Sequence, residues 1–185
     1  DKITLQGMAI SGWEAVGVEN TVTKAEGNKV MTINGESAFR VFSRYFGFSE
    51  NPVSHQQKLV ELMANYPFQF IKEGGYTILR SPIRIDPEEG SITLAATVNE
   101  GDKFKFSYSP GFKVIDQTIE EFSRLKKKVP EADAIILFSC KGRHGAFGPL
   151  LEKEISGIYD YWKKPMIGFL SYGELGDIGN GKCEF

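Results

Sequence analysis

The sequence predicts an α/β fold with a mixed sheet and with helices packed on that sheet. Two observations predict this fold class. Segments with alternating apolar residues fill much of the first 110 residues, as in strands with one buried face. After them come two continuous apolar segments separated by a helix, which is typical of a βαβ unit. We therefore expect an N-terminal hairpin, an antiparallel meander and a C-terminal βαβ unit, arranged around one large sheet.

The N-terminal part is predicted to hold a strand followed by a hairpin. Residues 2–10 mix apolar and polar side chains as a strand does, and Ser11-Gly12 interrupts that pattern. An extended segment over 16–24 is then expected to pair with 29–33. The turn between them is Glu26-Gly27-Asn28, because glycine and asparagine tolerate positive φ.

Two helices are predicted next. Residues 37–46 carry apolar side chains at a spacing of three or four, and Gly47 is a favourable C-terminal stop. Residues 55–66 show the same spacing, with Ser54 as N-cap and Pro67 as terminator.

A meander of three antiparallel strands should follow these helices. The alternating segments are 76–85, 91–98 and 104–108, and turn residues separate each from the next. We expect one face of this meander to pack on a core.

The βαβ unit is predicted in the last third of the chain. An amphipathic helix over 111–129 precedes an apolar strand at 134–138. A helix over 149–162 then leads to a second apolar strand at 166–170. The first strand is expected to be buried on both faces, because it carries no polar residue. Strands joined by such a crossover run parallel and end at the same edge of the sheet.

That shared edge is where we expect a ligand. The loops after the two strands are 139–145 and 171–176, and neighbouring strands lie ~5 Å apart, so the loops should face each other. Ligands of open α/β sheets bind beyond the carboxyl ends of strands. The candidate ligand-binding residues are Ser139, Cys140, Gly142, Arg143, Tyr172, Gly173 and Glu174, together with Arg80 of the meander.

Two of these residues predict the kind of ligand. Arg143 offers a fork of donors suited to a carboxylate, and Glu174 offers an acceptor for an ammonium group. An amino acid carries both groups. The alternative is that Arg143 and Glu174 pair with each other and hold the loops together. Tyr172 is the aromatic residue expected to touch the ligand, whereas Arg80 could equally have a surface or sheet-edge role.

Composition argues against several classes of partner and location. The 185 residues include 22 basic and 24 acidic side chains, a balance with no overall attraction for nucleic acid or anionic lipid. No run of ~18 apolar residues is present, so we expect no membrane span. Two cysteines are too few for a disulfide framework, which favours a cytoplasmic setting.

A cysteine-dependent hydrolase is an alternative, with Cys140 as the nucleophile at a turn between a strand and a helix. The base would have to be His55 or His144, and His144, four residues away on the same loop, has no obvious orienting acid. The spacing of these histidines with Cys140 and Cys183 does not fit a zinc site. We therefore expect no catalytic residues, no metal and no cofactor.

Two segments of the βαβ region carry a specific resemblance. They are Ala134-Ile-Ile-Leu-Phe-Ser-Cys-Lys-Gly-Arg143 and Pro165-Met-Ile-Gly-Phe-Leu-Ser-Tyr-Gly-Glu174-Leu-Gly176. They resemble the C-terminal region of the FIST family, in which an apolar strand ends in Ser-Cys-x-x-Arg and a later strand continues to Gly-Phe-x-x-x-Gly-Glu-Ile-Gly. Earlier matches occur in the family's order: Gly12-Trp13, Gly17, Thr23-Lys24, the 34–38 helix start, Arg80, 86–92 and Glu100-Gly101.

The resemblance implies a sensory domain of bacterial or archaeal signal transduction that is not an enzyme. Such a domain would bind a small polar ligand such as an amino acid, and act on a signalling partner or an attached output module. The resemblance also implies that residues 1–185 are one domain, or the C-terminal half of a larger one whose N-terminal part is missing. Haem-based gas sensing is an alternative within the family, with His55 or His144 as axial ligand.

Overall fold

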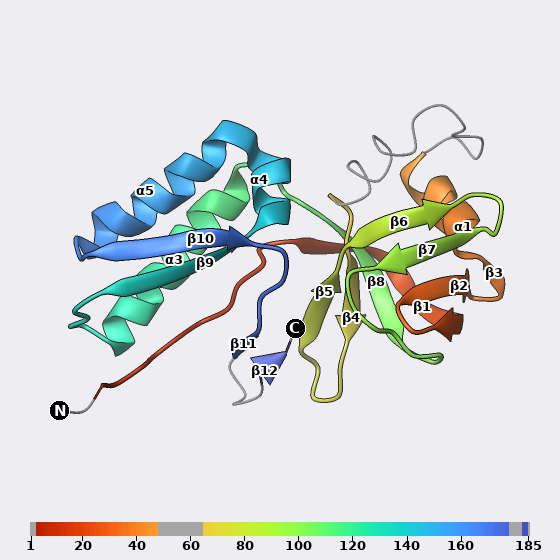
Figure 1. Ribbon diagram of the computed structural model, residues 1–185, viewed down its shortest axis with the longest axis horizontal. Helices are drawn as coiled ribbons and strands as arrows, with labels where there is room; N and C mark the ends of the chain where they lie inside the picture. The colour runs from red at the N-terminus through yellow and green to blue at the C-terminus, as the bar shows by residue number, and fades with distance from the viewer. Residues whose placement is uncertain (1–2, 48–64, 178–182, 185) are drawn as a thin grey trace. The chain divides into compact units, whose positions relative to one another are not determined.

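The computed structural model describes residues 3–47, 65–177 and 183–184, and these fall into two compact units (Figure 1). The sheet unit spans Glu14–Tyr108, and the βαβ unit combines Asp1–Trp13 with Ser109–Phe185. Within the described part of the chain, no helix is long and apolar enough to cross a membrane.

The sheet unit is built on an antiparallel sheet that curls. Its strands are β1 (Glu14–Glu26), β2 (Lys29–Ile33), β3 (Glu36–Ser37), β4 (Phe68–Ile71), β5 (Thr77–Arg80), β6 (Pro82–Asp86), β7 (Ser91–Leu94) and β8 (Lys103–Tyr108). They lie in the order β5-β4-β8-β1-β2-β7-β6, with β3 beside β2. Because β5 and β6 end this order and only Ser81 separates them in sequence, the sheet must curl to bring its two ends together.

The predicted hairpin is confirmed as β1 and β2, which pair from Val22↔Ile33 to Glu26↔Lys29. The long strand β1 has an irregularity at Gly17, where φ is 78°. The hydroxyl of Tyr45 accepts a hydrogen bond from the Val18 amide at 3.1 Å and occupies the space that a Cβ on Gly17 would need. Glycine is therefore required here for its φ and for the close approach of a side chain.

The first predicted helix is confirmed as α1 (Ala38–Phe46). Its N-cap is Ser37, whose hydroxyl accepts from the Arg40 amide, and its C-cap is Gly47 in the left-handed conformation. The second predicted helix, 55–66 with its cap Ser54, lies almost entirely outside the described residues.

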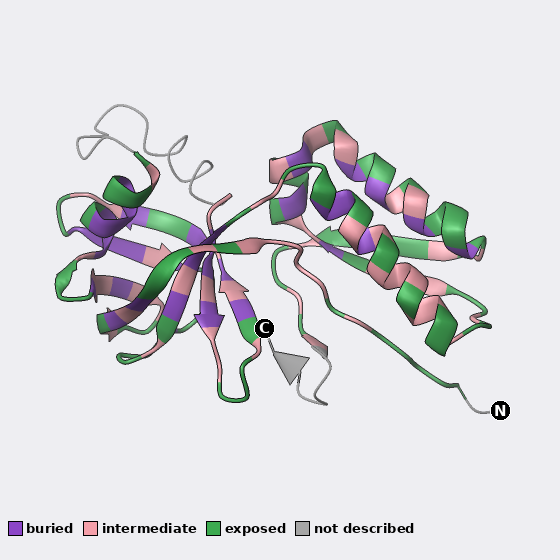
Figure 2. Ribbon diagram, turned by 180° about the vertical axis from the view of Figure 1, so that it is seen from behind, coloured by how far each residue is buried: buried purple, intermediate pink, exposed green. Residues whose placement is uncertain are grey.

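The core of the sheet unit is an aromatic cluster between α1 and the sheet. Phe42 of α1 meets Phe106 edge to face at 5.5 Å between ring centroids, and Phe68 stacks on Phe104 at 4.6 Å. Figure 2 shows buried residues repeating along these strands. Alternate positions point inward, as the period of two in a strand requires.

The predicted meander is confirmed at its first turn, where β6 pairs with β7 up to Asp86↔Ser91, but its other pairings are wrong. The segment 76–85 forms two strands at opposite ends of the sheet, because Pro82 cannot donate a ladder hydrogen bond and restricts the residue before it. The segments 91–98 and 104–108 do not pair with each other either, since β7 pairs with β2 and β6 whereas β8 pairs with β1 and β4. The turn between them bonds to β1: the Val22 amide donates to the Asp102 carbonyl at 2.9 Å. The sequence analysis also missed β4.

The βαβ unit contains the predicted parallel pair and the predicted helices. Its elements are α3 (Lys113–Lys128), β9 (Ile135–Cys140), α4 (Lys141–Phe147), a 3-10 turn (Gly148–Leu150), α5 (Leu151–Trp162), β10 (Met166–Ser171), β11 (Gly176–Asp177) and β12 (Cys183–Glu184). Strands β9 and β10 pair in parallel from Ile135↔Met166 to Cys140↔Ser171. Helices α3 and α5 pack closely, because Gly157 leaves room for the side chain of Ile119.

The predicted α/β class is thus confirmed, but three expectations for its parts are corrected. Residues 3–13 form no strand, since the described part of the chain offers them no pairing partner. The parallel pair is a separate sheet and does not join the antiparallel strands. One face of β9 is exposed, with Ile136 at 62% and Phe138 at 56% of full exposure, so its apolar sequence does not reflect burial on both sides.

Candidate functional site

The candidate site lies where β9 and β10 end. Cys140 and Ser171 are the last register partners of the parallel pair, so the segments that follow start side by side at one edge. This confirms the predicted geometry of the two strand ends. The predicted loop 139–145 is, however, mostly the short helix α4, which begins directly after Cys140. After Ser171 the chain runs through an irregular segment, 172–175, into β11.

Three side chains meet at this edge. The Ser171 hydroxyl donates to Oε1 of Glu174 at 2.6 Å. The Cys140 thiol lies half-buried beside the same carboxylate and hydrogen-bonds to it. Glu174 therefore accepts from the ends of both strands, and it joins the two segments that sequence analysis placed together. Ser171 begins the predicted loop 171–176 but was not named among the ligand-binding residues, although its position at the end of an apolar strand is a signal for it.

The thiol of Cys140 is held in its neutral form. Burial raises the pKa of the Cys140 thiol above its ordinary value of 9.0, and the charge and hydrogen bond of Glu174 raise it further. The backbone amides of Gly142 and Arg143, at the start of α4, lower this pKa in part but do not form a regular cap. A protonated thiol can donate a hydrogen bond to Glu174, but it is a poor nucleophile.

The guanidinium of Arg143 is not free for a ligand's carboxylate, contrary to expectation. Its side chain is buried and forms a two-point ion pair with Glu154 of α5, with Nε to Oε1 at 3.1 Å and Nη2 to Oε2. Nη2 also donates to the Thr118 hydroxyl at 3.0 Å, and Nη1 donates to the Ser11 carbonyl at 2.5 Å. All three guanidinium nitrogens thus have partners inside the βαβ unit. The alternative pairing with Glu174 is also wrong, because the partner carboxylate is Glu154.

Aromatic rings hold the same guanidinium in place. Its central carbon lies 5.6 Å from the Trp13 ring centroid and 5.3 Å from that of Phe147. The two rings are 5.7 Å apart and belong to a small apolar cluster with Val114 and Leu151. Arg143 therefore fixes α4 between α3, α5 and the N-terminal segment.

The remaining predicted site residues are spread over different environments. Ser139 points to the helix side of β9, is 6% exposed, and its hydroxyl has no hydrogen-bond partner among the described residues. Gly142 lies beside the thiol, since a Cβ there would be 3.5 Å from Cys140 Sγ. Tyr172, 88% exposed, and Gly173 lie at the surface of the edge. Arg80 belongs to β5 of the sheet unit, where it is buried and donates to the Leu79 carbonyl at 3.2 Å.

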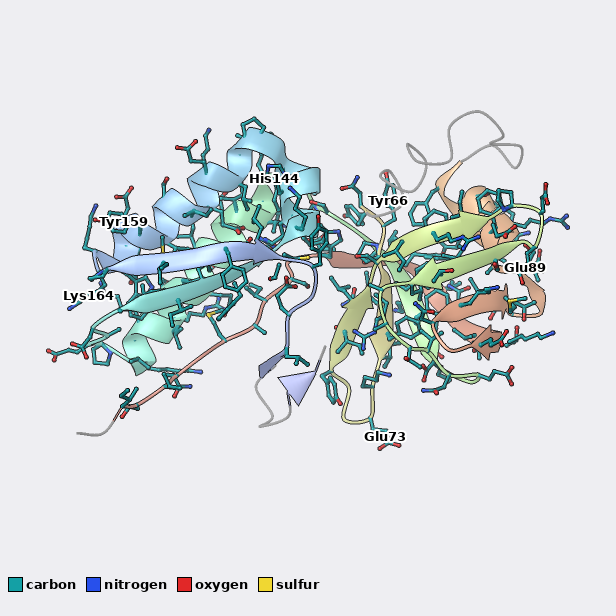
Figure 3. All side chains as sticks on the ribbon, in the orientation of Figure 1. Tyr66, Glu73, Glu89, His144, Tyr159 and Lys164 are labelled. Atoms are coloured by element: carbon teal, nitrogen blue, oxygen red, sulfur yellow. The ribbon has the colours of Figure 1, made fainter. Side chains whose placement is uncertain are left out.

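The described part of the chain does not assemble a cysteine hydrolase site. Nδ1 of His144 lies 3.0 Å from Nζ of Lys141, and the imidazole is exposed on α4, where Figure 3 labels it. A histidine that acted as general base beside Cys140 would lower the pKa of the thiol, whereas the pKa of this thiol is raised. His55 lies outside the described residues. In the same described ranges, no group of three potential metal ligands comes together.

The raised thiol pKa predicts a slow and pH-dependent alkylation of Cys140. In a Cys183→Ser protein, iodoacetamide should react more slowly with folded than with urea-unfolded chain at pH 8, and the folded rate should rise with pH through the raised pKa. Glu174→Gln removes a negative charge next to the thiol and should speed the reaction, because one pKa unit changes the thiolate fraction about tenfold. Mass spectrometry of the modified peptide measures both rates.

The matched control for this alkylation is Glu152→Gln, an exposed carboxylate on α5, which should leave the rate unchanged. Equal rates for the Glu174→Gln and parent proteins would show that Glu174 does not act on the thiol.

The fold and this edge define a mixed α/β domain with a small polar cluster at the ends of a parallel strand pair. The profile of the FIST C domain matches residues 38–177, from the start of α1 to the end of β11. That match covers most of the chain, which therefore belongs to the FIST C domain family, a family of sensory domains in signal transduction. No curated protein and no solved structure matches the chain.

Proposed function

We propose that this domain senses a small polar ligand that binds at the carboxyl edge of β9 and β10. The observation that carries the proposal is the convergence of Cys140, Ser171 and Glu174 at the ends of two parallel strands. This is the position at which α/β folds bind ligands. Glycines at 142 and 173 leave the backbone on either side of the cluster open to close approach.

The chemistry of the edge favours a ligand with an amino group. Arg143 is paired with Glu154, so the charged group that the cluster of Cys140, Ser171 and Glu174 offers to a ligand is the carboxylate of Glu174. A primary ammonium would replace the weak thiol donor at Glu174 with a charge-assisted hydrogen bond. An amino acid fits through its ammonium group, and the exposed ring of Tyr172 could cover its side chain. The ligand's carboxylate would then meet backbone amides and not a guanidinium.

Binding would act on output by shifting a conformational equilibrium. A ligand changes the populations of two states only by its difference in affinity for them. We propose that the bound state is read by a signalling partner or an attached module, and that the site performs no catalysis. The neutral thiol of Cys140 and the exposed His144 support this non-enzymatic function.

Isothermal titration calorimetry tests the proposal. The twenty amino acids, simple primary amines and the corresponding carboxylic acids without an amino group should be titrated into the chain. We expect binding by at least one amine-bearing compound and none by its amine-free analogue. Glu174→Gln should weaken that binding about tenfold or more, because a hydrogen bond to a charged group contributes about 1.5–3 kcal/mol.

The control variant is Glu152→Gln, which should bind like the parent chain. Binding that prefers the amine-free acids, or that is indifferent to Glu174→Gln, would contradict the assignment of Glu174.

A further inference from the structure

The N-terminal segment 9–13 is held by the elements that follow both strands of the candidate site. From the β9 side, Arg143 of α4 donates to the Ser11 carbonyl at 2.5 Å and lies 5.6 Å from the Trp13 ring centroid. From the β10 side, Gly176 lies so close to Ala9 that a Cβ on the glycine would be 2.7 Å from the Ala9 Cβ. Two segments that leave one sheet edge thus meet the same short stretch of chain.

Each of these contacts is only a few residues from the polar cluster. Arg143 lies three positions after Cys140 on a helix of seven residues, and its amide faces the Cys140 sulfur. Gly176 lies two positions after Glu174, in the strand β11. A shift of the backbone at Cys140 or Glu174 would therefore act directly on the start of α4 or of β11.

Segment 9–13 is also tightly packed and leads out of the unit. Gly12 has φ 78°, and a Cβ there would lie 2.6 Å from Cγ1 of Val114 on α3. The next residue after Trp13 is Glu14, the first residue of β1 and of the sheet unit. The segment thus contacts Arg143 and Gly176 in the βαβ unit and continues covalently into the first strand of the sheet unit.

We propose that the segment Ala9–Trp13 is the output element of the candidate site, and that Arg143 is the positioning residue that couples the two. This inference rests on the proposed function. Occupancy at Cys140 and Glu174 shifts the first turn of α4, and the guanidinium then changes its hold on the Ser11 carbonyl and the Trp13 ring. The ion pair with Glu154 keeps Arg143 anchored to α5 while its contacts to the segment change.

Trp13 reports this coupling directly. The chain contains two tryptophans, so Trp162→Phe leaves Trp13 as the single tryptophan, whose emission can be excited apart from that of the tyrosines. Its ring lies 5.7 Å from Phe147 and next to the Arg143 guanidinium, and its emission depends on both neighbours.

The experiment uses the full chain with Trp162→Phe and Cys183→Ser, and iodoacetamide as a probe of the site. The Cys140 thiolate displaces iodide and forms a carbon–sulfur bond, while the thiol proton passes to the buffer. The added carboxamide occupies the edge beside Glu174. We expect alkylation to change Trp13 emission and to increase amide hydrogen exchange in the peptide that covers 9–13 several-fold.

Arg143→Lys separates coupling from a general loss of structure. Lysine keeps a charge for Glu154 but lacks the planar fork that reaches Ser11. In this variant, the same alkylation should leave Trp13 emission unchanged while the far-UV spectrum shows a folded chain. Cys140→Ser, treated with the same reagent, should give no response. Hydrogen exchange of the 9–13 peptide before and after alkylation is also compared in the chain that retains Arg143. This comparison tests the coupling even if the Arg143→Lys variant does not fold.

Unchanged emission and exchange after complete alkylation would overturn the inference, as would an equal response with lysine at position 143. Its failure is distinguishable from failure of the proposed function. A chain that binds no amine but responds at Trp13 retains the coupling, whereas a chain that binds an amine without any response at 9–13 retains only the binding site.

Discussion

Replacing Glu154 with alanine is expected to lower the free energy of unfolding of the βαβ unit by about 3–5 kcal/mol. The side chains of Arg143 and Glu154 are only 8% and 5% exposed, so the variant leaves a buried guanidinium without its counter-charge. The remaining acceptors are the neutral Ser11 carbonyl and Thr118 hydroxyl, which cannot replace a two-point carboxylate. Urea denaturation followed by the helical circular dichroism signal measures the loss.

A double variant tests whether the cost comes from the unpaired charge. Arg143→Met combined with Glu154→Leu removes both charges, and apolar replacement of a buried pair is often neutral or stabilising. The double variant should therefore be more stable than Glu154→Ala alone. Glu152→Ala, on the exposed side of α5, should stay within about 0.5 kcal/mol of the parent chain. A loss for Glu154→Ala no larger than for Glu152→Ala would contradict the role of the ion pair.

Replacing Phe106 with alanine is expected to destabilise the sheet unit by about 3–5 kcal/mol. Phe106 is fully buried, and its ring lies 4.8 to 5.5 Å from the ring centroids of five neighbours. The neighbours are Phe42, Tyr45, Phe46, Phe68 and Phe104. Such a cluster spans α1 and two strands, so it cannot collapse into the space that the ring leaves. Chemical denaturation monitored by near-ultraviolet circular dichroism follows the loss of aromatic packing.

The control for this cavity is Phe112→Ala, because Phe112 is 66% exposed and the change removes little packing. Phe106→Leu should cost less than Phe106→Ala, since leucine fills part of the volume. Similar losses for Phe106→Ala and Phe112→Ala would show that the aromatic cluster does not hold the sheet unit together.

Local signals predicted those elements whose boundaries depend on neighbouring residues. Ser37 and Gly47 define the ends of α1 because capping acts within one helical turn. The β1–β2 hairpin follows from its Gly27-Asn28 turn, and the parallel pair follows from two apolar segments around a helix. The pairing of more distant strands was not predictable in this way. Strand β8 pairs with β1 and β4, and the alternation of its side chains does not specify its partners.

The candidate site was predictable in position but not in its pairings. The common edge of β9 and β10 follows from the βαβ connection, so Cys140 and Glu174 were expected near each other. The ion-pair partner of Arg143 was not predictable, because Glu154 lies eleven positions away on another helix. One signal was present in the sequence. Glu154 is three residues after Leu151 and four before Ile158, which places a carboxylate on the apolar face of α5, and a buried charge requires a partner.

The open face of the parallel pair affects how this chain behaves in different solvents. Ile136 faces Ile167 in register, Phe138 faces Phe169, and these four side chains are 56% to 72% exposed. Water is thus in contact with an unbroken hydrocarbon strip along both strands. Ammonium sulfate and similar excluded salts strengthen the burial of such surface. The ammonium sulfate concentration at which the chain precipitates should therefore depend on this strip more than on the small net charge of the chain.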